Sequence, residues 1–242
     1  MTLRVAVIGA GGRMGSATRA AIEADDTLEL VAAVGRGDPL DTMVEAGAEV
    51  AVEFSTPASV RDNTAWLLDH GVHAVVGASG LSADDLDDLR ARTGRANCLV
   101  VANFAIGAVL LMRLAAEAAR HLAAVEITEL HHDRKLDAPS GTALRTAALI
   151  AAARVDAGLP APEVPGPSDE PSRGLLVDGV PIHSVRLPGL VASQEVTFGA
   201  PGQTLTLRHD SIDRTSFMPG VLLAVHHIAD LPGLTLGLDP LL

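Results

Sequence analysis

The first hundred residues alternate short apolar runs with helical patterns, and this alternation constrains the fold more than any other feature. Runs of about 4–8 apolar residues, rich in β-branched side chains, are typical of strands buried on both faces. Such strands, separated by helices, indicate a parallel sheet with right-handed crossovers and helices on each side. We therefore predict an α/β protein whose N-terminal part is a Rossmann-type doubly wound parallel sheet, with strands at residues 4–8, 28–34, 49–54, 73–77 and 97–103.

The pattern changes after residue 103. A helical stretch at 108–121 leads into a strand at 125–130, a polar loop and a second helix at 140–157. Five of the fourteen prolines then lie at 160–171, and this crowding predicts an exposed, irregular connection.

The C-terminal part predicts antiparallel strands with turns at Pro188-Gly189 and Pro201-Gly202, followed by a helix at 219–231. One helix pair can cover only one face of the resulting sheet, so we expect the other face to pack on another subunit. The expected strands lie at 182–187, 191–199 and 203–210.

These patterns divide the chain into two domains. We predict a dinucleotide-binding domain at 1–104, to which a C-terminal segment at about 215–242 returns. Residues 105–214 are predicted to form a smaller α+β domain with an open mixed sheet, which serves substrate binding and oligomerisation.

Composition narrows the possible functions. A net charge of −12, an aromatic content of 2% and the absence of tyrosine argue against nucleic-acid or anionic-membrane partners. The single cysteine, Cys98, excludes an intramolecular disulfide and a zinc site built on several thiolates. No apolar run reaches the roughly 18 residues of a membrane span, and the chain runs from its first residues into a strand. We expect a cytoplasmic globular protein.

A glycine-rich turn follows the first strand. The segment GAGGRMG places Gly9, Gly12 and Gly15 immediately before a helix. Glycines permit a tight turn and close backbone approach, and a helix N-terminus offers free N–H groups to a pyrophosphate. The alternative is an ordinary strand-to-helix turn, but the position inside an alternating α/β pattern favours a dinucleotide.

Two later turns lie where the nicotinamide end of such a cofactor would be. They follow the fourth and fifth strands, and ligands of open α/β sheets bind outside the carboxyl ends of strands. Ordinary turns of small residues remain an equal alternative here. The turns consist of Gly77, Ala78, Ser79 and Gly80, and of Ala102, Asn103, Phe104 and Ala105.

The segment ELHHDRKLDAPSGTA, residues 129–143, is the densest polar cluster of the chain. It lies between a strand and a helix, so that His131, His132 and Lys135 can converge with the helix N-terminus at Ser140 on one anion. Lys135 is the only lysine beside seventeen arginines. A lysine can surrender its proton, whereas an arginine effectively cannot, although chance in an arginine-rich chain explains this usage equally well.

Three other interpretations of this segment compete. A metal site would need a third and a fourth ligand, which the neighbouring sequence does not convincingly offer. Ser140 could be a nucleophile, but its position favours a helix cap, and no nucleophile elbow surrounds it. The segment could also be an ordinary solvated turn.

Six motifs together resemble the dihydrodipicolinate reductases, also called 4-hydroxy-tetrahydrodipicolinate reductases, of bacterial lysine and diaminopimelate synthesis. The resemblance spans nearly the whole chain, and the stretch HHDRKLDAPSGTA is very specific. In chain order the motifs are GAGGRMG, VEFSTP, VVGASG, ANFAIG, ELHHDRKLDAPSGTA and HDSIDRTSFMPGV.

The resemblance implies an N-terminal dinucleotide-binding domain and a C-terminal substrate domain whose open sheet forms the core of a homotetramer. It implies NADPH- or NADH-dependent reduction of 4-hydroxy-tetrahydrodipicolinate to tetrahydrodipicolinate, without a metal. Hydride goes to a conjugated ring carbon, and a proton goes to the electron-rich intermediate. A substrate with two carboxylates agrees with the anion site inferred above.

The resemblance also assigns roles to residues. His131 corresponds to the general acid/base, and Lys135 to the proton donor that also lies near a substrate carboxylate. His132, Gly141 and Thr142 correspond to substrate-binding positions, beside the helix cap Ser140. The positions implied for the cofactor are Gly9, Ala10, Gly11, Gly12, Arg13 and Met14 in the pyrophosphate turn, and Gly77, Ala78, Ser79, Ala102, Asn103, Phe104 and Ala105 around the nicotinamide.

Two departures from the family pattern stand out. Gly77-Ala78-Ser79 replaces the frequent G-T-T, which keeps the turn. Gly35 replaces the acidic residue after the second strand, which in NAD-preferring sites binds the adenosine ribose and repels a 2′-phosphate. Arg36 follows and can pair with that phosphate. We therefore predict dual cofactor use with NADPH preferred, although Asp38 could reach back to the ribose.

Two rival functions remain. Another two-domain dehydrogenase would act on a different small acid, such as a 2-oxo acid or a semialdehyde. A dinucleotide sensor would bind the cofactor without turnover, but the presence of both His131 and Lys135 argues against it.

Overall fold

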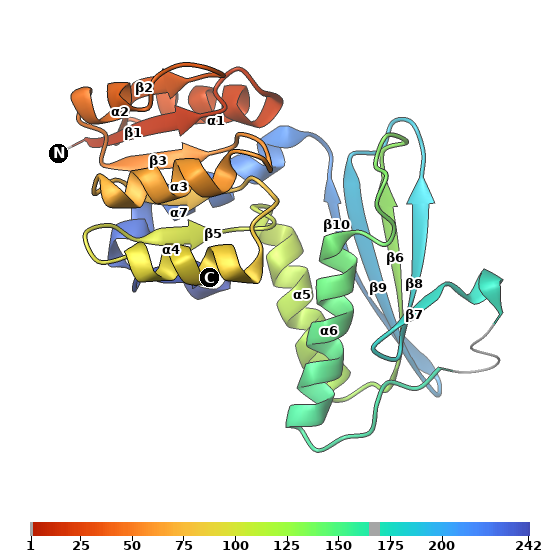
Figure 1. Ribbon diagram of the computed structural model, residues 1–242. Helices are drawn as coiled ribbons and strands as arrows, with labels where there is room; N and C mark the ends of the chain where they lie inside the picture. Colours follow the sequence, from red (N-terminus) through yellow and green to blue (C-terminus); the bar gives the residue numbers. More distant parts are fainter. Residues whose placement is uncertain (1, 165–169) are drawn as a thin grey trace. The chain divides into compact units, whose positions relative to one another are not determined.

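The computed structural model describes residues 2–164 and 170–242, which form two compact units (Figure 1). Unit 1 comprises Met1–Ile106 and Arg214–Leu242, and unit 2 comprises Gly107–Asp213. The chain thus leaves unit 1 after Ile106 and re-enters it at Arg214. Part of the proline-rich connection predicted at 160–171 lies outside the described residues, which omit 165–169.

Unit 1 is built on a six-stranded sheet in which all neighbouring strands are parallel, in the order β11-β5-β4-β3-β1-β2. Four strands fall within the predicted runs, β1 begins one residue before its run, and β11 is an additional edge strand. The strands are β1 (Leu3–Ile8), β2 (Leu28–Val34), β3 (Val50–Glu53), β4 (His73–Val76), β5 (Cys98–Val100) and β11 (Leu234–Leu236). The Rossmann-type prediction is confirmed.

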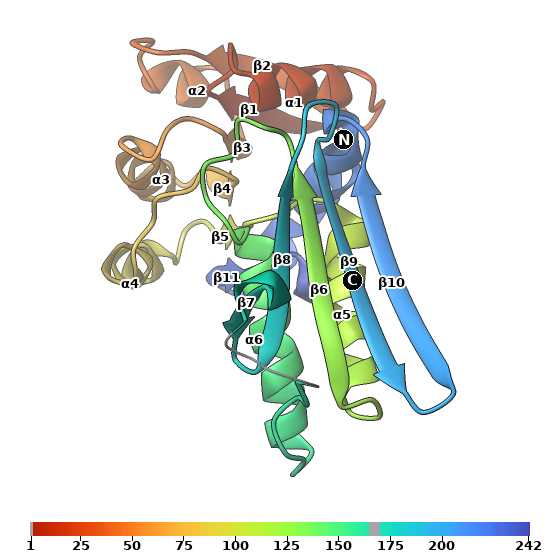
Figure 2. The same cartoon turned by 90° about the vertical axis from the view of Figure 1, so that its right-hand side faces the viewer.

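Helices cover both faces of this sheet, with α3 and α4 on one face and α1 on the other (Figures 1 and 2). The central strands β1, β3 and β4 are therefore largely buried on both faces, and Val5, Val52 and Val75 are fully buried. The predicted helix at 219–231 is α7 followed by a 3₁₀ turn. The helices are α1 (Arg13–Glu23), α2 (Asp41–Glu45), α3 (Val60–Asp69), α4 (Ala83–Arg92) and α7 (Met218–His227), with 3₁₀ turns η2 (Arg214–Phe217), η3 (Ile228–Asp230) and η4 (Asp239–Leu241).

Unit 2 contains a five-stranded mixed sheet in the order β10-β9-β6-β8-β7. Its central strand β6 runs parallel to β8 and antiparallel to β9. The predicted mixed sheet is confirmed. Strands β8 and β9 run in opposite directions, as expected, but they do not pair with each other because β6 lies between them. The strands are β6 (Ala124–His131), β7 (Leu175–Val177), β8 (Val180–Arg186), β9 (Ala192–Ala200) and β10 (Gln203–Ser211).

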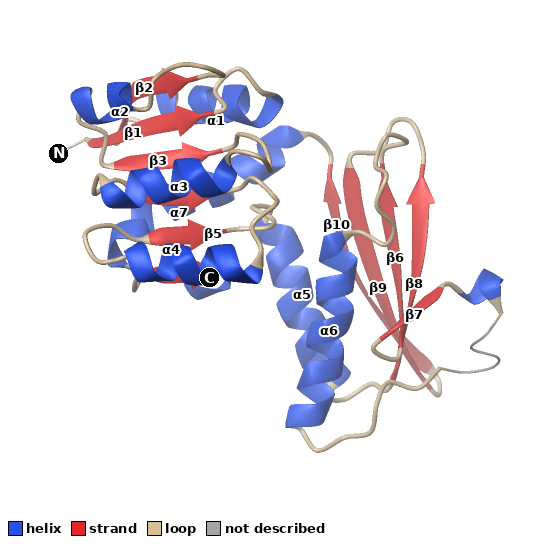
Figure 3. Ribbon diagram, in the orientation of Figure 1, coloured by secondary structure: helices blue, strands red, loops and turns tan. Residues whose placement is uncertain are grey.

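Helices α5 (Ile106–Ala119) and α6 (Gly141–Asp156) cover one face of this sheet (Figure 3), and a 3₁₀ turn η1 spans Pro171–Arg173. The core between these layers includes Leu111, Ile127, Ile150 and Phe198. Side chains alternate along β6, so Glu129 points to the same covered face as Ile127 and is fully buried. This alternation brings a carboxylate into the core next to the polar loop.

No helix among the described residues is long and apolar enough to span a membrane.

Candidate active site

The glycine turn after β1 has the geometry that close backbone packing requires. Gly9 has a φ of +75°, and a Cβ there would lie 2.4 Å from the carbonyl oxygen of Phe54. A Cβ on Gly15 would lie 2.2 Å from the carbonyl oxygen of Gly9. Both positions therefore exclude any side chain, whereas Gly11 faces open space.

A cavity of about 520 Å³ opens at this turn, beside the carboxyl ends of β1, β2 and β3. Strands β2 and β3 lie on opposite sides of β1, so the cavity occupies the switch point where open α/β sheets bind ligands. Of the predicted cofactor residues, Gly9, Gly11, Gly12 and Arg36 line the cavity. The side chain of Ala10 is buried below the turn.

The N-terminus of α1 suits an anion. Gly12 is its N-cap and supplies no side-chain hydrogen bond, and the first turn, which holds the predicted Arg13 and Met14, contains no acidic residue. The first N–H groups of a helix have no intrahelical acceptor and carry the positive end of the helix dipole. The turn and the helix together fit the pyrophosphate of a dinucleotide.

The position after β2 is occupied differently from the family pattern. Gly35 has no side chain, but its N–H donates to Oδ2 of Asp38 over 2.8 Å. A Cβ on Gly35 would lie 3.2 Å from that same oxygen, so the carboxylate of Asp38 lies where a side chain at position 35 would begin. Arg36 is exposed and makes no hydrogen bond or ion pair with any described residue.

The loops after β3, β4 and β5 meet at two aromatic rings. The rings of Phe54 and Phe104 lie edge to face with centroids 5.7 Å apart. A Cβ on Gly77 would lie 2.1 Å from Phe54 and 2.7 Å from Phe104, so only glycine fits between the rings. Phe54 also lines the cavity at the glycine turn, so its ring lies between that cavity and the loop that holds Gly77.

The other predicted nicotinamide positions lie outside the lining of that cavity. Ser79 and Ala102 are exposed, while Ala78 and Ala105 pack inward. Asn103 accepts a hydrogen bond from the N–H of Ala105 over 2.9 Å, which closes the turn after β5.

One buried acid beside the cavity escaped the sequence analysis. Glu53 at the end of β3 is fully buried, and its Oε1 accepts from the N–H of Ser55 (3.2 Å) and from Nδ2 of Asn63 (3.1 Å). Its Oε2 has no hydrogen-bond partner in the described parts of the chain. Burial raises the pKa of Glu53 above its ordinary value.

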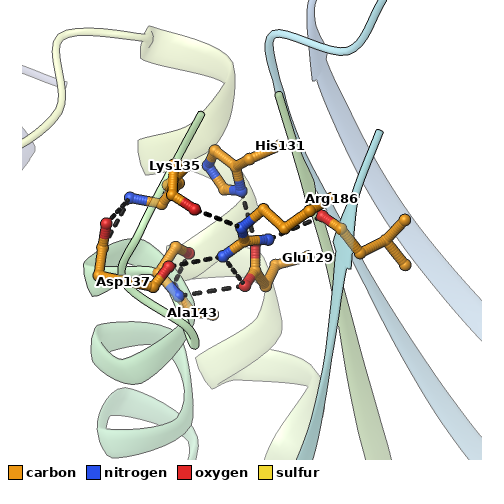
Figure 4. Close-up of polar contacts among 8 residues, drawn as sticks. Glu129, His131, Lys135, Asp137, Ala143 and Arg186 are labelled. Carbon is orange, nitrogen blue, oxygen red and sulfur yellow. Dashed lines mark hydrogen bonds and ion pairs between the residues drawn. The ribbon is translucent and has the colours of Figure 1, made fainter. Parts of the chain in front are cut away.

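A second polar cluster lies at the carboxyl end of β6 (Figure 4). His131 ends this strand, and its Nδ1 lies 2.5 Å from Oε2 of Glu129. Arg186, at the end of the neighbouring strand β8, donates to both oxygens of Glu129 over 2.8 and 2.9 Å. A buried carboxylate thus joins the predicted catalytic histidine to a guanidinium.

Arg186 also holds the loop that carries Lys135. Its Nη2 donates to the carbonyl oxygen of Asp137 over 2.7 Å, and its Nε donates to that of Lys135 over 3.3 Å. The Lys135 ammonium donates to both carboxylate oxygens of Asp137 over 2.6 and 2.8 Å, and the lysine side chain is 20% exposed. Lys135 is therefore held near the mouth of the cluster by an exposed carboxylate.

Ser140 is the N-cap of α6, as the sequence predicts. Its hydroxyl accepts from the N–H of Ala143 over 3.2 Å, and its own N–H donates to Oε1 of Glu129 over 3.3 Å. The hydroxyl is thus used in capping, which supports the interpretation as a cap. Gly141 and Thr142 form the first turn of α6, and a Cβ on Gly141 would meet open space.

His132 follows on the same loop with a buried Nδ1. Within residues 2–164 and 170–242 this nitrogen has no hydrogen-bond partner. A buried polar atom without a partner is costly, which is consistent with a position that binds a polar ligand.

Electrostatics set the protonation states of this cluster. Burial acts to raise the pKa of Glu129, but hydrogen bonds from its partners, above all Arg186, outweigh burial and lower that pKa. Burial lowers the pKa of His131, and the opposing effect of Glu129 does not restore it. Glu129 is therefore ionised and His131 neutral near neutral pH. Hydrogen bonding to Lys135 lowers the pKa of Asp137.

Among the described residues, no group of three or more His, Cys, Asp or Glu side chains could hold a metal ion. The sequence analysis found the histidines, the lysine and the helix cap, but missed Glu129, Arg186 and Asp137. Glu129 and Arg186 are 57 residues apart and meet only because β6 and β8 pair in parallel. A buried glutamate in an alternating strand was the one signal that could have been used.

In comparisons with known proteins, both parts of the chain match models of one family. Residues 3–104 match the family model described as dihydrodipicolinate reductase, N-terminus, and residues 107–242 match dihydrodipicolinate reductase, C-terminus. The 4-hydroxy-tetrahydrodipicolinate reductase of Nocardia farcinica is 55% identical over 246 residues, covering 100% of this chain and 99% of that protein. That of Streptomyces coelicolor is 54% identical over 98% of this chain and 96% of that protein.

A solved structure is similar over its whole length. It is the dipicolinate-bound dihydrodipicolinate reductase from Paenisporosarcina sp. TG-14, with a TM-score of 0.87, 36% identity and 100% coverage of both chains.

Proposed function

The chain belongs to the dihydrodipicolinate reductase family, and we propose that it is a 4-hydroxy-tetrahydrodipicolinate reductase that uses NADPH or NADH. The observation that carries this proposal is the presence of two different sites in one chain. A glycine cradle in unit 1 fits a dinucleotide, and a cluster of His131, Lys135 and the α6 N-terminus in unit 2 fits a carboxylated ring. The reaction converts substrate, NAD(P)H and a proton into tetrahydrodipicolinate, NAD(P)⁺ and water.

When bound, the nicotinamide supplies the hydride. We propose that the chain's residues bind the substrate and deliver the proton. The N-terminus of α6 at Ser140, Gly141 and Thr142 offers N–H groups to one carboxylate, as helix N-termini do. His132, with its unpartnered Nδ1, is proposed to bind the substrate as well.

Lys135 is the proposed proton donor, and His131 the general acid/base. The Lys135 ammonium already lies against a carboxylate, that of Asp137, over 2.6 Å. A substrate carboxylate has the same chemistry and could take the place of Asp137 on the ammonium. His131 is mostly enclosed, with a side chain 14% exposed, so that a proton on it is partly shielded from water.

For the cofactor we propose dual use with NADPH preferred. Gly35 brings no negative charge to the position after β2, and Arg36 is exposed beside the cavity with its guanidinium unpaired among the described residues. The carboxylate of Asp38 at Gly35 supports the NADH part of this dual use.

The remaining proposals concern assembly and environment. We propose a homotetramer that works in the cytoplasm without a metal, and without a nucleic-acid or membrane partner. Within unit 2, α5 and α6 pack on the same face of the sheet, and the opposite face carries Glu126, Glu195 and Arg208. Light scattering of the purified protein would give the number of subunits directly.

A coupled assay tests the reaction. Dihydrodipicolinate synthase generates the substrate in place, and the loss of nicotinamide absorbance at 340 nm follows its reduction. Because one relative was solved with dipicolinate bound, pyridine-2,6-dicarboxylate should inhibit competitively against the substrate. Cofactor binding without turnover would instead support the rival sensor function, and turnover of 2-oxo acids or semialdehydes alone would support a different dehydrogenase.

A further inference from the structure

The buried carboxylate of Glu129 lies at the centre of the polar cluster in unit 2. Glu129 is not among the residues to which substrate binding or proton transfer was assigned above. It is fully buried, and four groups converge on it: Nδ1 of His131, the guanidinium of Arg186, the N–H of Ser140 and the side chain of Ser184. Figure 4 shows His131 and Arg186 directed toward its two oxygens. A single acid thus connects β6, β8 and the start of α6.

From this geometry we propose that Glu129 is a positioning residue that fixes His131 in the tautomer with the proton on Nδ1, and that Arg186 holds Glu129 in place. The inference deepens the proposed function, because it assumes that His131 acts in the reaction.

The tautomer follows from the hydrogen-bond partners. An ionised carboxylate can only accept hydrogen bonds, so the Nδ1 of His131 next to it must be the donor. A neutral imidazole carries one proton, which leaves Nε2 as a bare acceptor. Nε2 has no hydrogen-bond partner among the described residues and is free to exchange a proton with a ligand.

Arg186 keeps Glu129 ionised and thereby maintains the tautomer of His131. A buried carboxylate without a cation would tend to take up a proton, and a protonated Glu129 could donate to Nδ1 and reverse the tautomer. The two parallel hydrogen bonds from Arg186 stabilise the ionised form and fix the plane of the carboxylate. The same guanidinium binds the carbonyl oxygens of Lys135 and Asp137, so the loop and the histidine share one anchor.

Nitrogen-15 NMR of the wild-type protein tests the tautomer without any assay. The chemical shifts of imidazole nitrogens separate protonated from bare atoms, and the variant His131→Gln identifies the resonances by their loss. Near neutral pH we expect a protonated Nδ1 and a bare Nε2 for His131. A bare Nδ1 overturns the proposal, and this measurement remains valid even if the Glu129 variant does not fold.

The substitution Glu129→Gln then tests the consequence. Glutamine has nearly the same shape, but its amide can donate as well as accept, so Nδ1 is no longer fixed as the donor. We expect kcat to fall by at least about 10²-fold, the low end for a positioned acid or base, with an unchanged Kd for the cofactor. The groups that face His131 are Glu129, Lys135 and Arg186. Loss of the one negative charge among them should move the His131 limb of the pH–kcat profile to lower pH.

The same strand offers a matched control. Glu126 also accepts hydrogen bonds from a histidine and an arginine, His183 (2.9 Å) and Arg173 (2.6 Å), but it lies on the opposite face of the sheet and is 39% exposed. Glu126→Gln should leave the His131 tautomer and kcat unchanged, and light scattering should confirm that its subunit number equals that of the wild type.

Two results separate the proposals. A wild type that lacks turnover in the coupled assay contradicts the proposed function but leaves the tautomer measurement standing. A wild type that turns over, with a Glu129→Gln variant of unchanged kcat and pH profile, shows that Glu129 is only a structural acid.

Discussion

Replacing Arg36 by alanine tests how the chain selects its cofactor. If Arg36 pairs with the 2′-phosphate of NADPH, its loss removes a hydrogen bond to a charged group, worth roughly 1.5–3 kcal/mol. Because the guanidinium is exposed, solvent and salt screen the interaction, and we take the lower end of that range. A loss of about 1.5 kcal/mol corresponds to roughly a tenfold increase in Kd for NADPH. NADH lacks that phosphate, and its Kd should hardly change.

A substitution of Asp38 should shift the cofactor preference in the direction opposite to Arg36→Ala. Its carboxylate lies against the N–H of Gly35, where an acidic residue would accept hydrogen bonds from ribose hydroxyls. Asp38→Asn removes a negative charge that repels the 2′-phosphate, so we expect it to favour NADPH further and to weaken NADH.

The measurement is the Kd and KM of both cofactors for the wild type and the two variants, at one low and one physiological ionic strength. Screening predicts that the effect of Arg36→Ala decreases at the higher salt concentration. A wild type that favours NADH, or an Arg36→Ala variant that loses both cofactors equally, would refute the reasoning.

Four further substitutions give separate tests. Lys135→Arg keeps the charge but not the readily surrendered proton, so kcat should fall by at least about 10²-fold with little change in cofactor Kd; near-normal turnover would make the lysine an electrostatic anchor only. His131→Gln should lower kcat, whereas His132→Gln should mainly raise the substrate KM, and equal effects of the two would remove this division of roles. For Glu53→Gln, the Tm of the variant minus the Tm of the wild type should become more positive as pH increases. Burial raises the Glu53 pKa, so the folded wild type loses stability as pH rises above the ordinary value of 4.5, and a difference in Tm that is the same at pH 5 and pH 8 would contradict this.

The sequence predicted the elements that local pattern determines. The apolar runs located five of the six strands of unit 1, and the serine before α6 was found as its cap. The short elements β7, β11 and α2 were missed. The three residues of β11 carry no periodicity of their own, and they form a strand only because β5 offers an unpaired edge.

In the candidate site, too, the residues of a local motif could be predicted, whereas those that depend on strand pairing could not. His131, Lys135 and Ser140 lie in one contiguous motif and were readable from it. Arg186 was not, because its role depends on the parallel pairing of β8 with β6, two strands that are not adjacent in the sequence. Sequence spacing does not encode that register.

The discontinuity of unit 1 orders the events of synthesis on the ribosome. Its first five strands emerge early, but α7 and the edge strand β11 follow only after all of unit 2 has been translated. At about 5–20 residues per second, the nascent cofactor-binding sheet waits on the order of 10 s for these pieces, with the edge of β5 unpaired. Unit 2 is one continuous segment and has no such delay. The half of the protein that begins first is therefore the half completed last, and in that interval its exposed edge is open to chaperones and proteases.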